Sequence, residues 1–281
     1  MATRTASSSG AWTTATNWEA GAGPAPTNGD VADLNGKTMS LDVSDINVDS
    51  IIGTGGGLTC TTNRTITLTN AGTVISGTWT CTLNTASTTI TIAAGTGTIV
   101  GSTTAVTRFT VSGSSTTLTI TANLTGGSAT NSRIVNLTSG AVNITGDLTG
   151  GSGANSEALR VTGGTGTVTG NATGGSTNGI IALAAIVSGS SSILNFTGTV
   201  NGGSGTQGSA NTMGNHGLGV YNTGTLNLTG SVVDSAKYTA VVNSGGVFTY
   251  TPTAAQTATL GGKVLYNKPV RIVAMKANKA A

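Results

Sequence analysis

Residues 141–164 read AVNITGDLTGGSGANSEALRVTGG, and residues 117–140 read TLTITANLTGGSATNSRIVNLTSG. The two stretches align without a gap over 24 residues. Each contains a triplet of the form apolar–Thr/Asn–apolar, whose two outer side chains share one face of an extended strand. A repeat at a fixed spacing is the strongest indicator of architecture that a sequence offers.

The triplet recurs along most of the chain. The pairs of outer residues are Leu41/Val43, Ile66/Leu68, Ile90/Ile92, Leu118/Ile120, Val142/Ile144, a degenerate Gly166/Val168, Leu194/Phe196, Leu226/Leu228 and Phe248/Tyr250. Successive pairs are separated by 25, 24, 28, 24, 24, 28, 32 and 22 residues. A second mark, Gly-Gly-Ser, follows the same spacing at residues 126–128, 150–152, 174–176 and 202–204. Two independent marks that move together establish a repeat of about 24 residues.

A unit of this length with short strands and Gly/Ser/Asn turns is typical of one coil of a parallel β-solenoid. Helix is disfavoured because Thr, Ser, Gly and Val dominate and no apolar stripe at helical spacing occurs. Leucine-rich repeats are disfavoured because the units lack the several Leu residues and the Asn that such repeats need. We therefore predict an all-β chain, a single right-handed parallel β-helix of about nine coils.

The repeat also predicts the register and the organisation of the chain. The apolar pairs should stack as one inward column. The residues between them should align outward, namely Thr67, Thr91, Thr119, Asn143, Asn195 and Asn227. Residues 1–37 should form a Trp-containing N-terminal cap, 38–262 the β-helix and 263–281 a basic C-terminal segment. Trp12 and Trp18 are expected to cover the first coil, since an open solenoid end exposes an unpaired edge.

Composition and charge limit the class of protein. The opening MATRTASSSGAW lacks the features of a secretory signal, and the longest apolar run, IIALAAIV (180–187), is too short to span a bilayer. We therefore expect a protein made in a cytoplasm, with Cys60 and Cys81 reduced and buried on neighbouring rungs. The net charge is +3, and five of the twelve basic residues lie in the last nineteen. These lysines are scattered without aromatic interleaving, so no nucleic-acid partner is expected.

The sequence gives little support for an enzyme activity. Glycoside hydrolysis needs two carboxylates close together, and the coils offer only Asp147, Glu157 and Asp234. Asp147 and Glu157 fall at different places in their coil and should face different sides. The single histidine, His216, lies in the longest insertion, and neither cysteine has metal-ligand spacing. We expect no enzyme activity, no metal and no cofactor.

The first forty-odd residues differ from the repeats. They contain Trp12, Asn17-Trp18, Pro24 with Pro26, Gly29-Asp30 and the phrase LNGKTMSLDV (34–43). This opening resembles the start of phage virion surface proteins that continue into Gly/Thr-rich β-solenoids, and some bacterial surface solenoids open similarly. The resemblance implies a structural piece of a virus particle, either a capsid decoration protein, a head fibre, or a tail fibre or spike.

The interpretation that follows is a non-enzymatic phage capsid decoration or head-fibre subunit. It would be a homotrimer located on the virion after assembly in the host cytoplasm, with the major capsid protein or another virion protein as partner. The alternatives are a tail fibre or tailspike that binds or degrades host glycans, and a bacterial surface adhesin. Binding hot spots favour aromatic residues and Arg, and we place attachment at the two ends of the rod, where the N-terminal segment has two Trp residues and the C-terminal segment has Tyr266 and Arg271. The attachment candidates are Trp12, Trp18, Pro24, Pro26, Tyr266 and Arg271.

Overall fold

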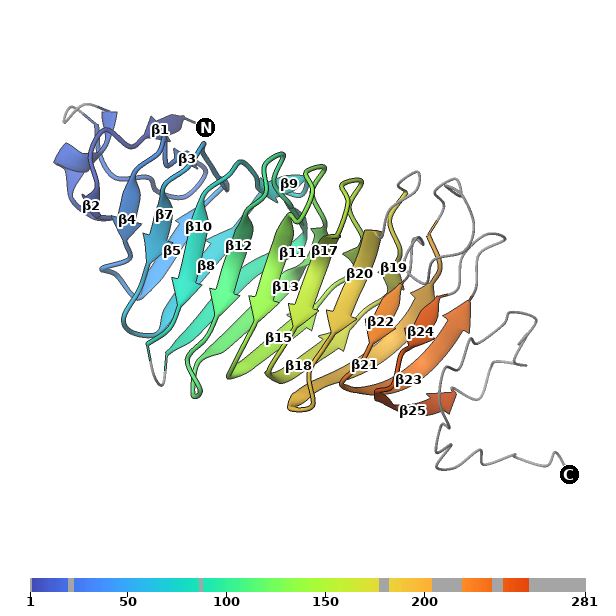
Figure 1. Cartoon of the computed structure of the whole chain (residues 1–281). Helices are drawn as coiled ribbons and strands as arrows, with labels where there is room; N and C mark the ends of the chain where they lie inside the picture. Colours follow the sequence, from blue (N-terminus) through green and yellow to red (C-terminus); the bar gives the residue numbers. More distant parts are fainter. Residues whose placement is uncertain are drawn as a thin grey trace, which may run out of the picture.

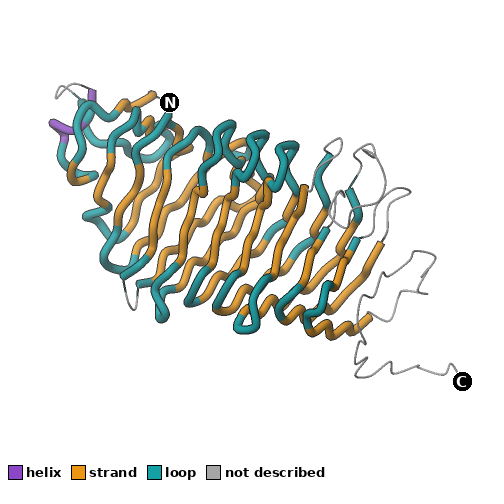
Figure 2. The backbone as a smooth tube through the Cα atoms, viewed as in Figure 1, coloured by secondary structure: helices purple, strands orange, loops and turns teal. Residues whose placement is uncertain are grey.

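The computed structural model describes residues 2–19, 23–85, 88–176, 182–203, 219–233 and 240–252. These residues form an elongated β-solenoid with the N-terminus at one end and the last described strand at the other (Figure 1). Strands pair in parallel from one coil to the next. Among the described residues the one helical segment is the short 3-10 turn η1 (Ala15–Asn17), seen in purple near the N-terminus in Figure 2. The predicted parallel β-solenoid is confirmed.

Each turn of the coil runs along three faces. Face 1 comprises β5 (Asp45–Val48), β8 (Arg64–Leu68), the first parts of β11 (Thr89–Val100), β13 (Thr117–Thr125), β21 (Ser192–Asn201) and β23 (Thr225–Val233), and β15 (Ala141–Thr145), β18 (Gly164–Thr169) and β25 (Val247–Pro252). Face 2 comprises β1 (Thr3–Thr5), β3 (Val31–Asp33), β6 (Ser50–Ile52), β9 (Thr73–Ile75), the later parts of the four long strands, β16 (Leu148–Thr149) and β19 (Ala172–Thr173). Together these two faces make a 15-stranded sheet.

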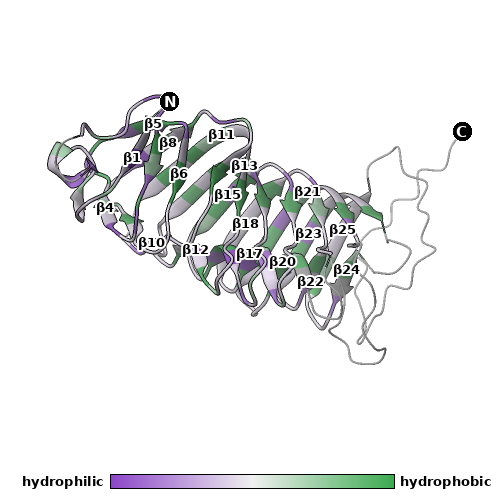
Figure 3. Ribbon diagram, turned by 90° about the horizontal axis from the view of Figure 1, so that it is seen from above, coloured by the Kyte–Doolittle hydropathy of each residue, from purple (hydrophilic) through white to green (hydrophobic). Residues whose placement is uncertain are grey.

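Face 3 is a separate 10-stranded sheet. It comprises β2 (Gly10–Ala11), β4 (Thr38–Ser40), β7 (Gly57–Thr59), β10 (Thr80–Leu83), β12 (Thr107–Val111), β14 (Arg133–Leu137), β17 (Ser156–Val161), β20 (Ala182–Val187), β22 (Val220–Asn222) and β24 (Val241–Asn243). The three faces enclose one continuous hydrophobic core. Figure 3 shows apolar residues along the strands of both sheets over the length of the rod.

Face 1 carries the inward column that the repeat predicts. Paired residues along it are Ile46, Ile66, Ile92, Ile120, Ile144, Val168, Phe196, Leu228 and Tyr250. All but Tyr250 are buried, and Tyr250 packs against the core partly exposed. Each large aliphatic side chain contributes about 1.5–3 kcal/mol when fully buried. The stability of the rod therefore accumulates turn by turn through contacts between neighbouring coils.

The predicted register is wrong in the first two coils. Ile66 pairs with Ile92 rather than with Ile90, and Arg64 takes the place opposite Ile90. The strand that stacks on β8 is β5, with Ile46 opposite Ile66. The triplet at residues 41–43 instead follows β4. The alternation of apolar and polar residues cannot reveal this shift, because moving a strand by two residues leaves the same side chains facing inward.

The outward column is confirmed from β11 onward. Thr91, Thr119, Asn143, Asn195 and Asn227 share one line of paired positions. That line also includes Thr167, which the prediction omitted. Thr67 pairs with Ala93 and lies two residues out of the line. Asn227 Nδ2 donates to Asn195 Oδ1 over 2.9 Å, so the column satisfies some of its own hydrogen bonds.

The Gly-Gly-Ser marks form the corner between face 2 and face 3, where the backbones of neighbouring coils touch. A Cβ atom on Gly151 would lie 2.2 Å from the carbonyl oxygen of Gly127 in the preceding coil. A Cβ atom on Gly126 would lie 2.5 Å from the backbone nitrogen of Gly151. Only glycine permits so close an approach. The spacing of these glycines therefore follows the coil.

From β5 the described residues complete about eight turns, and β25 begins another. The repeat predicts about nine coils beginning at Leu41. The inward column of face 1 begins instead at Ile46 in β5, and the described residues end in β25. The strands β1 to β3, within the expected cap at 1–37, continue the two sheets of the solenoid. The expected boundary at residue 262 lies outside the described residues. None of the described residues belongs to a helix that is long and apolar enough to cross a membrane.

Candidate interaction surface at the N-terminal end

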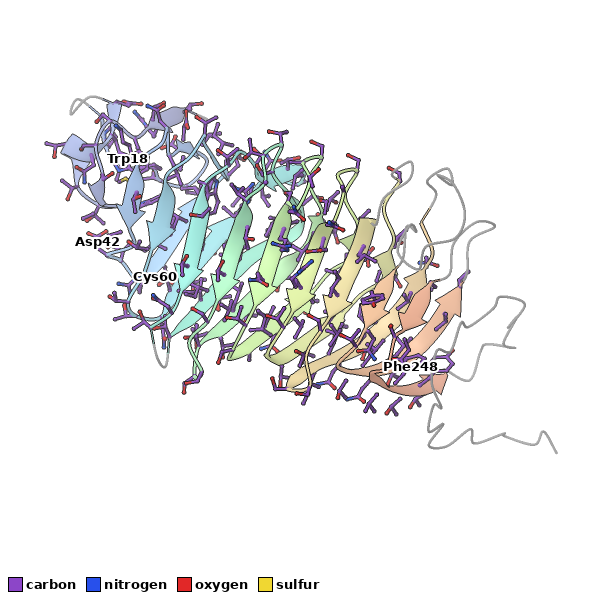
Figure 4. All side chains as sticks on the ribbon, viewed as in Figure 1. Trp18, Asp42, Cys60 and Phe248 are labelled. Atoms are coloured by element: carbon purple, nitrogen blue, oxygen red, sulfur yellow. The ribbon has the colours of Figure 1, made fainter. Side chains whose placement is uncertain are left out.

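Two tryptophans close the N-terminal end of the core. Trp12 and Trp18 pack edge to face with ring centroids 5.0 Å apart. The Trp18 indole Nε1 donates to the Trp12 carbonyl oxygen over 2.8 Å, which satisfies the buried indole. Trp18 is fully buried and Trp12 is 2% exposed. Figure 4 labels Trp18 at this end of the rod and Phe248 at the other.

Ion pairs and hydrogen bonds hold the N-terminal segment against the first strands. Arg4 donates to both carboxylate oxygens of Glu19, at 3.0 and 2.9 Å, and approaches Asp30 to 3.5 Å. Burial opposes ionisation of Asp30, but hydrogen bonds from Thr27 and Ala2 and the charge of Arg4 lower its pKa below the usual value. Asp30 is therefore charged at neutral pH and fixes the position of residues 27–30.

A second carboxylate lies beside the tryptophans. The backbone nitrogen of Thr13 donates to Asp42 Oδ1 over 3.0 Å, and the Thr13 hydroxyl donates to Asp42 Oδ2. Burial again acts against the charged form, but these hydrogen bonds prevail and lower the pKa of Asp42. Asp42, labelled in Figure 4, therefore contributes a negative charge to the N-terminal end. No basic side chain among the described residues forms a salt bridge with it.

Face 1 begins later than the other two faces. Before the first full turn, face 2 has β1 and β3 and face 3 has β2 and β4, whereas face 1 begins at β5. Within the described part of the chain, β5 pairs with β8 alone. The other edge of β5 therefore has no strand partner among the described residues. Faces 2 and 3 each extend two strands further toward the N-terminal end. An open strand edge is a template for the addition of another strand.

The open edge presents unused backbone hydrogen-bonding groups. The carbonyl oxygens of Ser44 and Val48 accept hydrogen bonds from the β8 segment, at 2.8 and 3.1 Å. In a parallel pair, alternate residues bond to the same neighbour. Asp45 and Asn47 therefore point their backbone N–H and C=O groups toward the open side. Both side chains are exposed, while Ile46 between them is buried.

A cavity of about 350 Å³ lies along this edge and is called the N-terminal groove below. Its lining residues are Trp12, Thr13, Ala25, Pro26, Thr27, Asn28, Val43, Asp45, Ile46 and Asn47. The lining combines an aromatic ring and aliphatic side chains with polar groups and one carboxylate. An apolar floor beside a free strand edge fits an extended peptide, whose main chain would bond to β5.

The structure separates the N-terminal candidates predicted from the sequence. Trp12 and Pro26 line the groove, and Trp18 packs behind Trp12 inside the core. Pro24 is exposed and does not contribute to the groove lining. The residues of the β5 edge, 45–47, were missed by the sequence analysis. The alternation in SDINVDS (44–50) was the available signal.

Several candidates cannot be placed. Tyr266 and Arg271 lie outside the described residues, as does the whole basic segment 263–281. The same holds for His216 and Asp234.

The two carboxylates considered for catalysis have structural partners. Asp147 Oδ1 accepts a hydrogen bond from the backbone nitrogen of Asn171 over 2.7 Å, as part of a ladder along the corner between face 1 and face 2. Glu157 is fully buried in β17 and accepts from Arg133 Nε over 2.7 Å and from Arg160 Nε over 3.0 Å. The expectation that Asp147 and Glu157 face different sides is confirmed, and they do not form a carboxylate pair.

The cysteines lie on neighbouring rungs of face 3, as expected. Cys81 is in β10, which pairs with β7, and Cys60 directly follows β7. Both are free and buried. The adjacent Cys60 and burial raise the pKa of Cys81. Across the described ranges, no group of three or more His, Cys, Asp or Glu residues could hold a metal ion.

Comparison with known proteins adds no relative. No protein-family model matches the chain, and neither the curated proteins nor the solved structures include a match. The functional proposals below therefore rest on the residues and the geometry described above.

Proposed function

We propose that this protein is a non-catalytic structural subunit of a virus particle, a stiff rod that attaches through its N-terminal end. The observation that carries the proposal is the N-terminal groove beside the open edge of β5. The resemblance of residues 1–45 to phage virion surface proteins favours a capsid decoration or head-fibre subunit. Its partner would be the major capsid protein or another virion protein, and its location the virion.

The surface along the sides of the rod supports attachment through the end. The central outward column of face 1 consists of Thr and Asn residues from Thr91 to Asn227, and Asn227 donates to Asn195 along it. Such a surface offers few of the aromatic and Arg anchors that dominate binding. The core runs unbroken from the tryptophans to the last described coil. A rod of this kind holds a fixed distance between its two ends.

The proposal predicts that attachment depends on the open edge of β5. A variant with Asp45→Lys and Asn47→Pro reverses the charge at the groove and removes the outward N–H of residue 47. It leaves the bonds between β5 and β8 intact, because Pro is tolerated on the free side of an edge strand. We expect incorporation into particles to fall by at least about tenfold, the effect of losing ~1.4 kcal/mol of binding.

The matched control is Asn143→Lys, an exposed outward position on the same face in the middle of the rod. It adds a positive charge without touching the groove, and we expect normal incorporation. Quantitative immunoblotting of purified particles against a capsid marker measures both variants. Equal incorporation of the two, with both folded, would move attachment to the flanks or to the other end. Cleavage of host glycans by the purified protein would instead favour the tailspike alternative.

A further inference from the structure

The N-terminal groove lacks the strand that its geometry accommodates, and the chain contains a segment suited to fill it. We propose that copies of this protein join head to tail, with residues 268–276 of one copy adding as a strand to the open edge of β5 in the next. The proposal concerns self-association of the purified protein and does not rest on the viral function.

The composition of residues 268–276, KPVRIVAMK, is the first argument for this occupant. Val and Ile are β-branched and favour extended strands. Val270 and Ile272 alternate with Arg271, so one face of an extended strand would place two branched aliphatic side chains side by side. These side chains match a groove whose lining includes Trp12 and Val43.

Charge complementarity is the second argument. Residues 1–50 contain six acidic residues and two basic ones, whereas residues 263–281 contain five basic residues and no acidic one. Asp45 lines the groove, Asp42 lies next to the lining residue Val43, and neither has a salt bridge among the described residues. A basic strand would supply the missing partners. Opposite charges would also speed the encounter between copies and make it salt-dependent.

The length of chain after β25 favours a second copy over the same copy. The groove and β25 lie about eight turns apart, or roughly 38 Å at about 4.8 Å per turn. Residues 253–267 could span at most about 50 Å when fully extended. A return to the same copy would use about three quarters of this maximum reach along the rod, at a cost in conformational entropy. In a head-to-tail contact the groove of the next copy lies beside the end from which the segment leaves.

The contact joins two different surfaces of the same chain, so it is heterologous. Each added copy leaves one groove and one C-terminal segment free, and growth does not stop at a fixed number. Full-length protein should therefore form chains whose mean length rises with concentration and falls with added salt.

Two complementary variants of the full chain test the contact. The first blocks the groove with Asn47→Pro and keeps its C-terminal segment. The second keeps its groove and reverses the segment with Lys268→Glu, Arg271→Glu and Lys276→Glu. Each variant alone lacks one half of the contact and should sediment as a monomer. Mixed in equal amounts they should form a heterodimer and nothing longer. Each set of substitutions should lower the affinity between copies by at least about tenfold, which corresponds to ~1.4 kcal/mol of binding free energy.

Sedimentation velocity over a concentration series at low and high salt distinguishes the outcomes, and circular dichroism verifies that both variants are folded. Chains of the unmodified protein together with a heterodimer of the variants support the proposal. A monomer at every concentration with no heterodimer on mixing means that the segment occupies its own groove or none, which overturns it. A closed oligomer that does not grow with concentration, or chains that persist in both variants, also overturns it.

Discussion

Replacing Gly198 by alanine should lower the melting temperature of the protein by on the order of 10 °C, equivalent to about 4 kcal/mol for a chain of this size. Gly198 lies in β21 with a φ of +144°. A Cβ atom there would lie 1.8 Å from the carbonyl oxygen of Gly170 in the preceding coil. The obstacle is backbone and not a flexible side chain, so two neighbouring coils would have to separate locally. Differential scanning calorimetry measures the shift.

Gly95→Ala is the matched control for this experiment. Gly95 also has a positive φ, at +56°, but no atom lies within 4 Å of the position its Cβ would take. The control therefore carries the strain of a left-handed alanine, about 1–2 kcal/mol, without the clash between coils. We expect a decrease of only a few degrees, on the order of 2–4 °C per kcal/mol. Similar losses in both variants would contradict the close contact between the backbones of Gly198 and Gly170.

Arg108→Met should have an effect of similar size for a different reason. Arg108 is 1% exposed in β12, where the next coil has Ile134 in the same place. Its guanidinium donates to the carbonyl oxygens of Gly77, Trp79 and Val100 at 2.9, 3.1 and 3.1 Å. Methionine fills a similar volume but leaves these carbonyls without donors, at about 1–3 kcal/mol for each one that stays buried. We expect a total loss of more than about 3 kcal/mol.

Arg108→Lys separates charge from geometry. Lysine keeps the positive charge, but its compact ammonium cannot reproduce the planar fork of donors, so an intermediate loss is expected. The Trp79 ring also lies 4.9 Å from the guanidinium and favours a cation there. Burial lowers the pKa of Arg108 to about 10, which still leaves it protonated at neutral pH. An equal stability of Arg108→Lys and the unmodified protein would contradict the role of the fork.

The linkage between pH and stability follows from the direction of that shift. Because burial lowers the pKa of Arg108 to about 10 in the folded state, the unfolded state binds more protons at this site at alkaline pH above about 10. The contribution of Arg108 to stability therefore rises with pH only in that alkaline window. Across the neutral range the difference in unfolding free energy between Arg108→Met and the unmodified protein should stay constant. Chemical denaturation at several pH values measures it.

The architecture was predictable because each coil of a solenoid repeats the same pattern of residues at a nearly constant spacing. The column from Ile92 to Leu228 and the glycine corners both follow from spacing alone. The first coil was misplaced because residues 41–43 and 46–48 both fit the apolar alternation. Only the pairing of Ile46 with Ile66 distinguishes them, and that depends on how the chain turns after β4.

The candidate site was predictable only in part. The concentration of Trp12 and the acidic residues indicated the N-terminal end, but the groove arises from the late start of face 1 at β5. That step depends on which strands find partners, which no local pattern encodes. Arg108 was missed for a similar reason. A lone arginine in a strand is ordinarily exposed, and its burial depends on carbonyl groups that other coils bring around it.

The central claim is that the rod is a particle component held by its N-terminal end. Cryo-electron microscopy of virus particles purified from cells that express this chain, with the averaged density fitted by the solenoid, tests it most directly. We predict a rod roughly 40 Å long over its eight turns, joined to the particle at the end that contains Trp12 and the N-terminal groove. A rod lying along its flank, contact through the opposite end, or particles without the chain would contradict the claim.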